Sequence, residues 1–228
     1  MMMIVRLFPK TDLSKVWEYV ESDMIKNIES EGITPLYATQ TEGMMNVGVI
    51  FDANDPDNVA DFITENIAQI DEIHHSKTIT LMKPLFFPIP KTKPEQLQRF
   101  IIRIYTHARH YKEIYNFLRD YDYPYNLFPI YLTYSLGDED IILNVAADSY
   151  ETVSNFVKDQ IRYLDGSDTA LFFQVIKAKR FASLEKLIEH QQKHLAKDIP
   201  LEAQDTGFDY VEDFEYHALL TGAFRRDL

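Results

Sequence analysis

Histidines are the side chains in this sequence best able to bind a metal or move a proton. His190 and His194 lie four residues apart with Glu189 beside them, and His107 and His110 lie three residues apart. Either spacing can put two ligands on one face of a helix. No His-Glu-x-x-His motif accompanies them, and both histidine pairs sit beside polar helix faces. We therefore predict no metal and no other cofactor.

Other catalytic chemistries have less support. The chain has no cysteine, which excludes disulfides, thiolate nucleophiles and cysteine-ligated zinc or iron–sulfur sites. It contains no Gly-x-Ser-x-Gly motif, and its 7 glycines are too few to suggest a glycine-rich nucleotide loop. Carboxylates are abundant, but a catalytic pair is recognised by geometry and not by composition. The residues favour a binding protein over an enzyme and leave catalysis open.

Tyrosines are unusually dense between residues 105 and 134. A tyrosine buries a large apolar body and keeps one polar hydroxyl, which suits a ligand pocket or an interface as well as a core. Core or interface packing is the simpler interpretation of this group. Its members are Tyr105, Tyr111, Tyr115, Tyr121, Tyr123, Tyr125, Tyr131 and Tyr134.

Charge and hydropathy limit the kinds of partner that the chain is expected to bind. The net charge is −13 and the basic residues are scattered, so a phosphate backbone would repel the chain and we expect no direct nucleic-acid binding. No run approaches the ~18 apolar residues of a membrane span. The N-terminus reaches Arg6 too early for a signal peptide. A cytoplasmic protein that does not enter membranes is expected.

The two halves of the sequence repeat each other. Residues 33–43 and 127–137 align at a constant offset of 94 positions, and the alignment continues without a gap through 70 and 164. Residues 4–7 resemble residues 101–104 at the slightly larger offset of 97. Such self-similarity indicates a duplicated structural unit. The identical pairs in the first stretch are Pro35 and Pro129, Tyr37 and Tyr131, Thr39 and Thr133, and Gly43 and Gly137.

Hydrophobic periodicity predicts the same order of elements in both halves. Alternating patterns predict strands and 3.6-residue patterns predict helices. A glycine between two strands, at 43 and again at 137, suits a hairpin turn that needs a positive φ. The predicted strands are 3–8, 33–41, 45–51 and 75–83 in the first half, and 99–106, 128–135, 139–146 and 169–177 in the second. The predicted helices are 12–28 and 56–69, then 109–121 and 149–163.

The order β-α-β-β-α-β is the ferredoxin-like arrangement. We therefore predict an α+β protein of two tandem ferredoxin-like modules with antiparallel sheets, at 1–90 and 91–181. A third segment, 182–228, is predicted to be an amphipathic helix (182–197) and an acidic aromatic tail. Each module leaves one apolar sheet face bare, which must be covered. Either the two sheets of one chain lie face to face, or a second chain supplies the cover.

One turn of the second half resembles a known family. Gly137-Asp138-Glu139-Asp140 leads into the apolar strand 141–145, and a helix bearing Phe156 and a closing strand follow. This succession resembles the effector-binding domain of the Lrp/AsnC regulators, of the dimeric α/β-barrel type. The likeness covers about 98–180 best. In 3–83 it is weaker, because Asn46 stands where Asp140 would. Those regulators also carry a helix-turn-helix domain, which we do not expect in this protein.

The resemblance implies a small-molecule effector module without its own DNA reader. Effectors of that family, such as amino acids, bind near the Gly-x-x-Asp turn, so the candidate ligand-binding positions are Gly137, Asp138, Asp140, Tyr131 and Gly43. The ligand would lie between the halves, and its bound state would pass to a protein partner or to a second copy. No catalytic residue is assigned.

Two alternatives remain open. The first is an α/β-barrel enzyme that uses the same cleft, with or without haem. In it His107, His110 and Tyr131 would converge on a pocket, and His110, His190 or His194 would be candidate haem ligands. The second is a structural protein whose bare sheet faces build an assembly.

Overall fold

The computed structural model describes residues 1–24, 32–43, 46–87, 90, 93–94 and 96–182. The predicted C-terminal helix and acidic tail lie almost wholly outside these residues, as do the end of the predicted helix 12–28 and part of the connector between the modules. Among the described residues no helix is long and apolar enough to cross a membrane.

The predicted order of elements is confirmed in both halves. The first module runs through β1 (Met2–Pro9), α1 (Leu13–Ser22), β2 (Ile33–Thr41), β3 (Val47–Ala53), α3 (Pro56–Asp61), the π-helical segment η1 (Phe62–Asn66), the 3-10 segment η2 (Ile67–Gln69), and β4 (Ile73–Phe86). The second runs through β5 (Gln98–Thr106), η3 (Ala108–His110), α4 (Tyr111–Asp120), β6 (Leu127–Leu136), β7 (Ile141–Ala147), α5 (Tyr150–Phe156), η4 (Val157–Ile161) and β8 (Ser167–Arg180).

Short side chains begin the helices where the sequence predicts. The carboxylate of Asp12 accepts a hydrogen bond from the backbone N–H of Ser14, and Asp55 accepts one from Asp57, with Pro56 as the first helical residue. Ser149 caps α5 in the same way. These bonds satisfy backbone donors that a helix start leaves unpaired. The helix positions are therefore fixed by local sequence.

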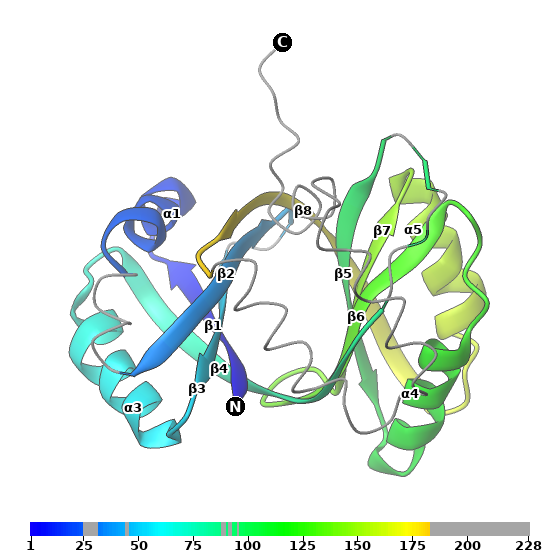
Figure 1. Cartoon of the computed structure of the whole chain (residues 1–228), viewed down its shortest axis with the longest axis horizontal. Helices are drawn as coiled ribbons and strands as arrows, with labels where there is room; N and C mark the ends of the chain where they lie inside the picture. The colour runs from blue at the N-terminus through cyan, green and yellow to red at the C-terminus, as the bar shows by residue number, and fades with distance from the viewer. Residues whose placement is uncertain (25–31, 44–45, 88–89, 91–92, 95, 183–228) are drawn as a thin grey trace.

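The two sheets form one closed barrel. Within each module the strand order is that of a ferredoxin-like sheet, and β2 pairs with β8 while β4 pairs with β6, all antiparallel. In Figure 1 the helices of the first module lie on one side of the strands, and those of the second on the opposite side. The fold is thus α+β, two ferredoxin-like modules in a dimeric α/β-barrel arrangement completed within one chain.

The two sheets face each other within one chain, which is one of the two predicted arrangements. They are also joined along both edges by hydrogen bonds. An edge strand presents unpaired N–H and C=O groups, and pairing the four edges removes all of them. The bare faces become the inside of the barrel, so a second chain is not required to cover them.

The repeated prolines mark repeated bulges. The register between β2 and β3 shifts between Pro35 and Tyr37, and the register between β6 and β7 shifts at the matching place, between Pro129 and Tyr131. A bulge inserts one extra residue and re-aims the side chains that follow it. As a result both tyrosines point into the barrel, where they join the apolar cluster shared by the two modules.

Two further apolar clusters lie between each sheet and its own helices. The first is built around Phe51 and Phe62, and the second around Phe100 and Leu143. Alternate residues of each strand therefore serve different cores, one face toward the helices and one toward the barrel axis. Because the helix-facing sides of the strands already form two apolar cores, the side chains that face the barrel axis need not be apolar.

Candidate functional site

The barrel interior holds an unusual set of buried polar side chains. A cavity of about 20 Å³ lies there, lined by residues of both modules. That is room for about one water molecule. Its polar lining includes Arg6, Tyr37, Arg99, Arg103, Tyr131 and Asn144, none of which is more than 7 % exposed. Small barrels are usually filled by apolar side chains, and burying polar groups costs free energy, so the polar lining calls for an explanation.

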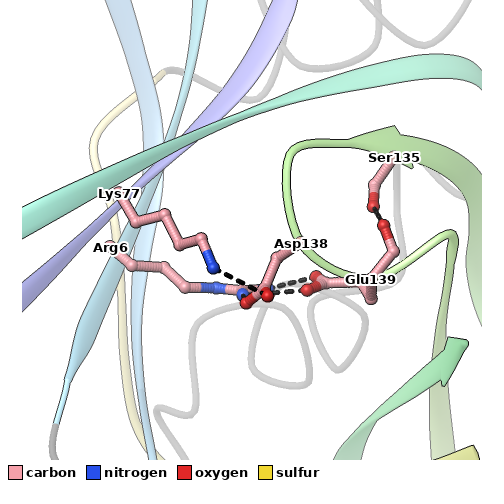
Figure 2. A network of polar contacts seen from close by, with 5 residues as sticks. All are labelled: Arg6, Lys77, Ser135, Asp138 and Glu139. Atoms are coloured by element: carbon pink, nitrogen blue, oxygen red, sulfur yellow. Dashed lines mark hydrogen bonds and ion pairs between the residues drawn. The ribbon is translucent and has the colours of Figure 1, made fainter.

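One end of the interior is crossed by an ion-pair network between the modules. Arg6, on β1, pairs with the buried carboxylate of Glu139 through both guanidinium nitrogens, one of them at 2.9 Å. It also contacts Asp138 at 3.1 Å, and Lys77 contacts the other oxygen of Asp138 at 2.7 Å. Figure 2 shows these groups meeting between β1 and the β6–β7 turn, where Ser135 donates to the backbone oxygen of Glu139.

The tyrosines and Arg99 form a second group. Arg99 Nε donates to Asn144 Oδ1 at 3.1 Å, and its guanidinium lies 5.3 Å from the centre of the Tyr37 ring. Burial raises the pKa of Tyr37 well above its ordinary value, and the neighbouring Tyr131 adds to the rise. Burial also raises the pKa of Tyr131. Both phenols are therefore neutral hydrogen-bonding groups at physiological pH.

These shifts predict a loss of stability in alkaline solution. An unfolded tyrosine titrates near pH ~10. Because folding raises the pKa of Tyr37 and Tyr131, their contribution to stability is complete below pH ~10 and falls as the pH rises above it. We expect their phenolate absorbance at 295 nm to develop only together with loss of the circular dichroism of the fold. A Tyr37→Phe/Tyr131→Phe variant should show a smaller late portion, because burial also raises the pKa of Tyr123, and an unchanged amplitude would contradict the assignment.

Arg103 is a buried cation that forms no ion pair with the residues that the structure describes, although Glu139 and Asp138 lie near enough to favour its charged form. It is 4 % exposed, and its guanidinium lies 5.0 Å from the centre of the Phe173 ring. Its Nε has no hydrogen-bond acceptor among the residues that the structure describes. Burial lowers the pKa of Arg103, and the nearby positive charge of Arg6 lowers it further.

Other residues of the cavity lining are also buried with an unsatisfied polar atom. Within the described part of the chain, Thr41 Oγ1, Asn46 Nδ2 and Asn144 Nδ2 lack hydrogen-bond partners. Buried polar atoms are nearly always satisfied in folded proteins. Unsatisfied atoms around a cavity therefore point to a bound water, ion or ligand.

The repeat shows which parts of this interior are shared by the modules. Arg6 corresponds to Arg103, and Tyr37 to Tyr131, at the offsets found in the sequence. Arg99 and Asn144 have no polar counterparts, because Met2 and Ile50 stand at the matching positions. Both modules thus contribute an arginine and a tyrosine at equivalent positions of the interior, whereas Arg99 and Asn144 come from the second module alone.

The candidate ligand-binding residues suggested by the Lrp/AsnC resemblance lie in different parts of the structure. Tyr131 lines the cavity, and Asp138 touches it indirectly through Arg6. Gly137, with φ +135°, is part of the β6–β7 turn, and Gly43, with φ +75°, of the β2–β3 turn. Asp140 accepts hydrogen bonds from the backbone of Thr106, at 2.7 Å, and from Tyr111, and its carboxylate raises the pKa of Tyr111 to about 12.

The structure does not bring the histidines of the enzyme alternative to this cavity. His110 lies between Arg109, at 2.8 Å, and Glu113, at 2.9 Å, outside the cavity lining. His107 pairs with Asp168 at 3.2 Å, and both are exposed. His190 and His194 fall outside the described residues. No group of three possible metal ligands occurs among the residues that were placed.

The three arginines are the residues that sequence reasoning missed. A signal for two of them was present. Arg6 and Arg103 stand at matching positions in the repeat, each two residues after an apolar residue of its strand. In a strand with a buried face, period-2 alternation puts those residues on one side. A repeated basic residue on that side is unusual, but its burial depends on barrel closure.

Comparisons with known proteins find distant structural likenesses and no match to a family model or a curated protein. Among solved structures, a proposed monooxygenase from Lactobacillus acidophilus aligns over 77% of this chain and 92% of its own, at 11% identity and a TM-score of 0.48. A haem-binding protein from Thermus thermophilus aligns over 83% and 94%, at 9% identity and 0.42. AsnC of E. coli aligns over 76% and 93%, at 13% identity and 0.32.

The aligned structures are described by very different activities, and AsnC is one of several. Fold alone does not assign function, because functions are carried by sites grafted on shared folds. At these identities and TM-scores the comparisons assign neither a ligand nor an activity to this chain.

Proposed function

We propose that this protein is a small-molecule effector-binding module whose ligand occupies the barrel interior between the two modules. One observation carries the proposal, namely the buried polar lining supplied by both halves. Burying an arginine costs free energy unless it is paired and hydrogen-bonded, and replacement by apolar residues is often neutral or stabilising. Three buried arginines and two buried tyrosines facing one cavity are therefore better explained by binding than by folding.

Because the cavity is small, binding of a ligand must change the packing of the residues that line it. Room for about one water molecule does not accommodate a metabolite, so the lining must move when one enters. Because the lining comes from both modules, that movement changes how the modules pack. A ligand that binds one packing better than the other shifts the equilibrium between them, which is what an effector does. A small ligand such as an amino acid fits this proposal.

The test is a thermal-shift screen of the purified chain against amino acids, organic acids and neutral metabolites. A ligand of the native state raises the melting temperature in a concentration-dependent way. We expect a stabilising compound whose effect is lost in Arg99→Met, a change that installs the residue of the first module. An absorption spectrum recorded beforehand detects haem, which would favour the enzyme alternative. A hit that Arg99→Met and Tyr131→Phe both leave unchanged would contradict a site in the barrel.

We also propose that the bound state is read by a second copy or by another protein. Barrel closure within one chain uses up the sheet edges, so such a partner would contact the outer surface. Light scattering after size exclusion, with and without the ligand found above, measures this. A molar mass that changes with ligand supports self-association, and an unchanged mass contradicts it.

A further inference from the structure

We infer that Arg103 binds an anionic group of the ligand, a carboxylate or a comparable small oxyanion, in a site that exists because the first module lacks a counter-ion. The inference rests on the proposed function and adds to it the chemical class of the ligand and the number of sites, one per chain.

The two modules carry equivalent arginines, Arg6 and Arg103. Arg6 is neutralised by Glu139 and Asp138, which the second module contributes from its β6–β7 turn. Arg103 occupies the same position in the second module, and its counter-ions would come from the β2–β3 turn of the first. The offset of 94 places Met44 and Met45 at the positions of Asp138 and Glu139. The arginine is repeated, but the carboxylates that neutralise it are not.

The surroundings of Arg103 agree with this broken repeat. Among the residues that the structure places, Arg103 makes no ion pair, and its Nε is buried without an acceptor. The ring of Phe173 is a weak substitute for an anion, since such a contact contributes ~0.5–2 kcal/mol. Glu139 and Asp138 both lie near enough to favour the charged form of Arg103, but Glu139 is paired with Arg6 and Asp138 with Arg6 and Lys77.

Hydrogen-bond donors complete the site. Asn46 Nδ2 and Thr41 Oγ1 line the same cavity as Arg103, and both are buried without a partner in the described part of the chain. Guanidinium, amide and hydroxyl groups can all donate to one acceptor. An arginine fork matches the two oxygens of a carboxylate, and such charge-assisted bonds are about twice as strong as neutral ones. A neutral ligand would leave the charge of Arg103 unbalanced, and a cation would be repelled.

Two substitutions address the site from opposite sides. Arg103→Gln removes the cation, and Met45→Glu adds the carboxylate that the second module has at Glu139. If the repeat argument holds, Met45→Glu fills the site with an internal anion, so it abolishes anion binding and raises the melting temperature of the ligand-free protein. Arg162→Gln, an exposed arginine on the outer surface, is the control for the change of net charge.

The probes are sodium formate, acetate, nitrate and phosphate, titrated at constant ionic strength by thermal shift and isothermal calorimetry. We expect saturable stabilisation of the wild type and of Arg162→Gln, a Kd at least tenfold higher in Arg103→Gln, and no saturable response in Met45→Glu. Circular dichroism establishes that each variant is folded, and Met45→Glu keeps the test valid if Arg103→Gln does not fold.

The outcomes separate this inference from the proposed function. If none of the anions stabilises the wild type and a neutral compound does so through Arg99, the barrel still binds a ligand and the role of Arg103 is overturned. Anion binding of unchanged affinity in folded Arg103→Gln also overturns it. If no compound of either class binds, both proposals fail, and the cavity holds water only.

Discussion

Replacing Glu139 with methionine is expected to lower the free energy of unfolding by about 3–5 kcal/mol, the range found when one partner of a buried ion pair is removed. Glu139 is 1 % exposed and Arg6 is 2 % exposed, so the substitution leaves a cation inside the protein without its main counter-ion. Methionine is the residue at the matching place in the first module, and its volume is close to that of glutamate. The loss therefore measures charge and not packing.

Urea unfolding at neutral pH, followed by circular dichroism, measures the change. Asp138→Asn serves as the comparison, because Asp138 is partly exposed and shared with Lys77, so its removal should cost at most about 1 kcal/mol. The double variant Arg6→Met/Glu139→Met should recover most of the stability, since it removes both charges. A loss below about 1 kcal/mol in Glu139→Met would mean that Arg6 finds other partners and that the network contributes little.

Gly166→Ala is expected to lower the free energy of unfolding by about 2–5 kcal/mol. Gly166 has φ +81°, a conformation that costs a residue with a side chain roughly 1–2 kcal/mol. In addition, an alanine Cβ would lie 2.3 Å from two ring carbons of His110 and 2.7 Å from its Cβ. Overpacking of this kind costs about 1–3 kcal/mol more. The ring is held by Arg109 and Glu113, so it cannot move away freely.

Gly43→Ala provides the matched control. Gly43 has a similar φ of +75°, but a Cβ there would meet nothing within 4 Å. Only the backbone cost should remain, about 1–2 kcal/mol. The same urea experiment on both variants separates strain from overpacking. Equal losses in the two would show that His110 relaxes at no cost, and His110→Ala in the Gly166→Ala background should otherwise restore part of the stability.

Several features of this protein follow from the sequence because they depend on neighbours along the chain. Helix starts at Asp12, Asp55 and Ser149 are set by side chains that bond two or three residues ahead. Hairpin turns at Gly43 and Gly137 follow from the positive φ that glycine tolerates. Internal repetition adds a long-range constraint, since a duplicated pattern of periods predicts a duplicated module even where one copy is ambiguous.

Barrel closure was implied by the family resemblance but not by the hydrophobic pattern. Alternation along a strand shows which face is apolar, but it does not identify the strand that will pair with an edge. Pairing of β2 with β8 and of β4 with β6 joins residues more than 40 positions apart and satisfies backbone groups that carry no sequence signature. A face-to-face stack and a closed barrel therefore predict the same hydrophobic pattern, and only the tertiary structure distinguishes them.

The candidate site was likewise predictable from the sequence in part only. The sequence by itself determined the fold class, the duplicated modules, their turns and the tyrosines at 37 and 131, because each rests on local conformation or on the repeat. Only the tertiary structure decided that Arg6, Arg99 and Arg103 are buried together, and that Glu139 neutralises the first of them. A basic residue in a strand is ordinarily a solvated one. It becomes a buried charge only after two sheets close around it, which is a property of the whole barrel.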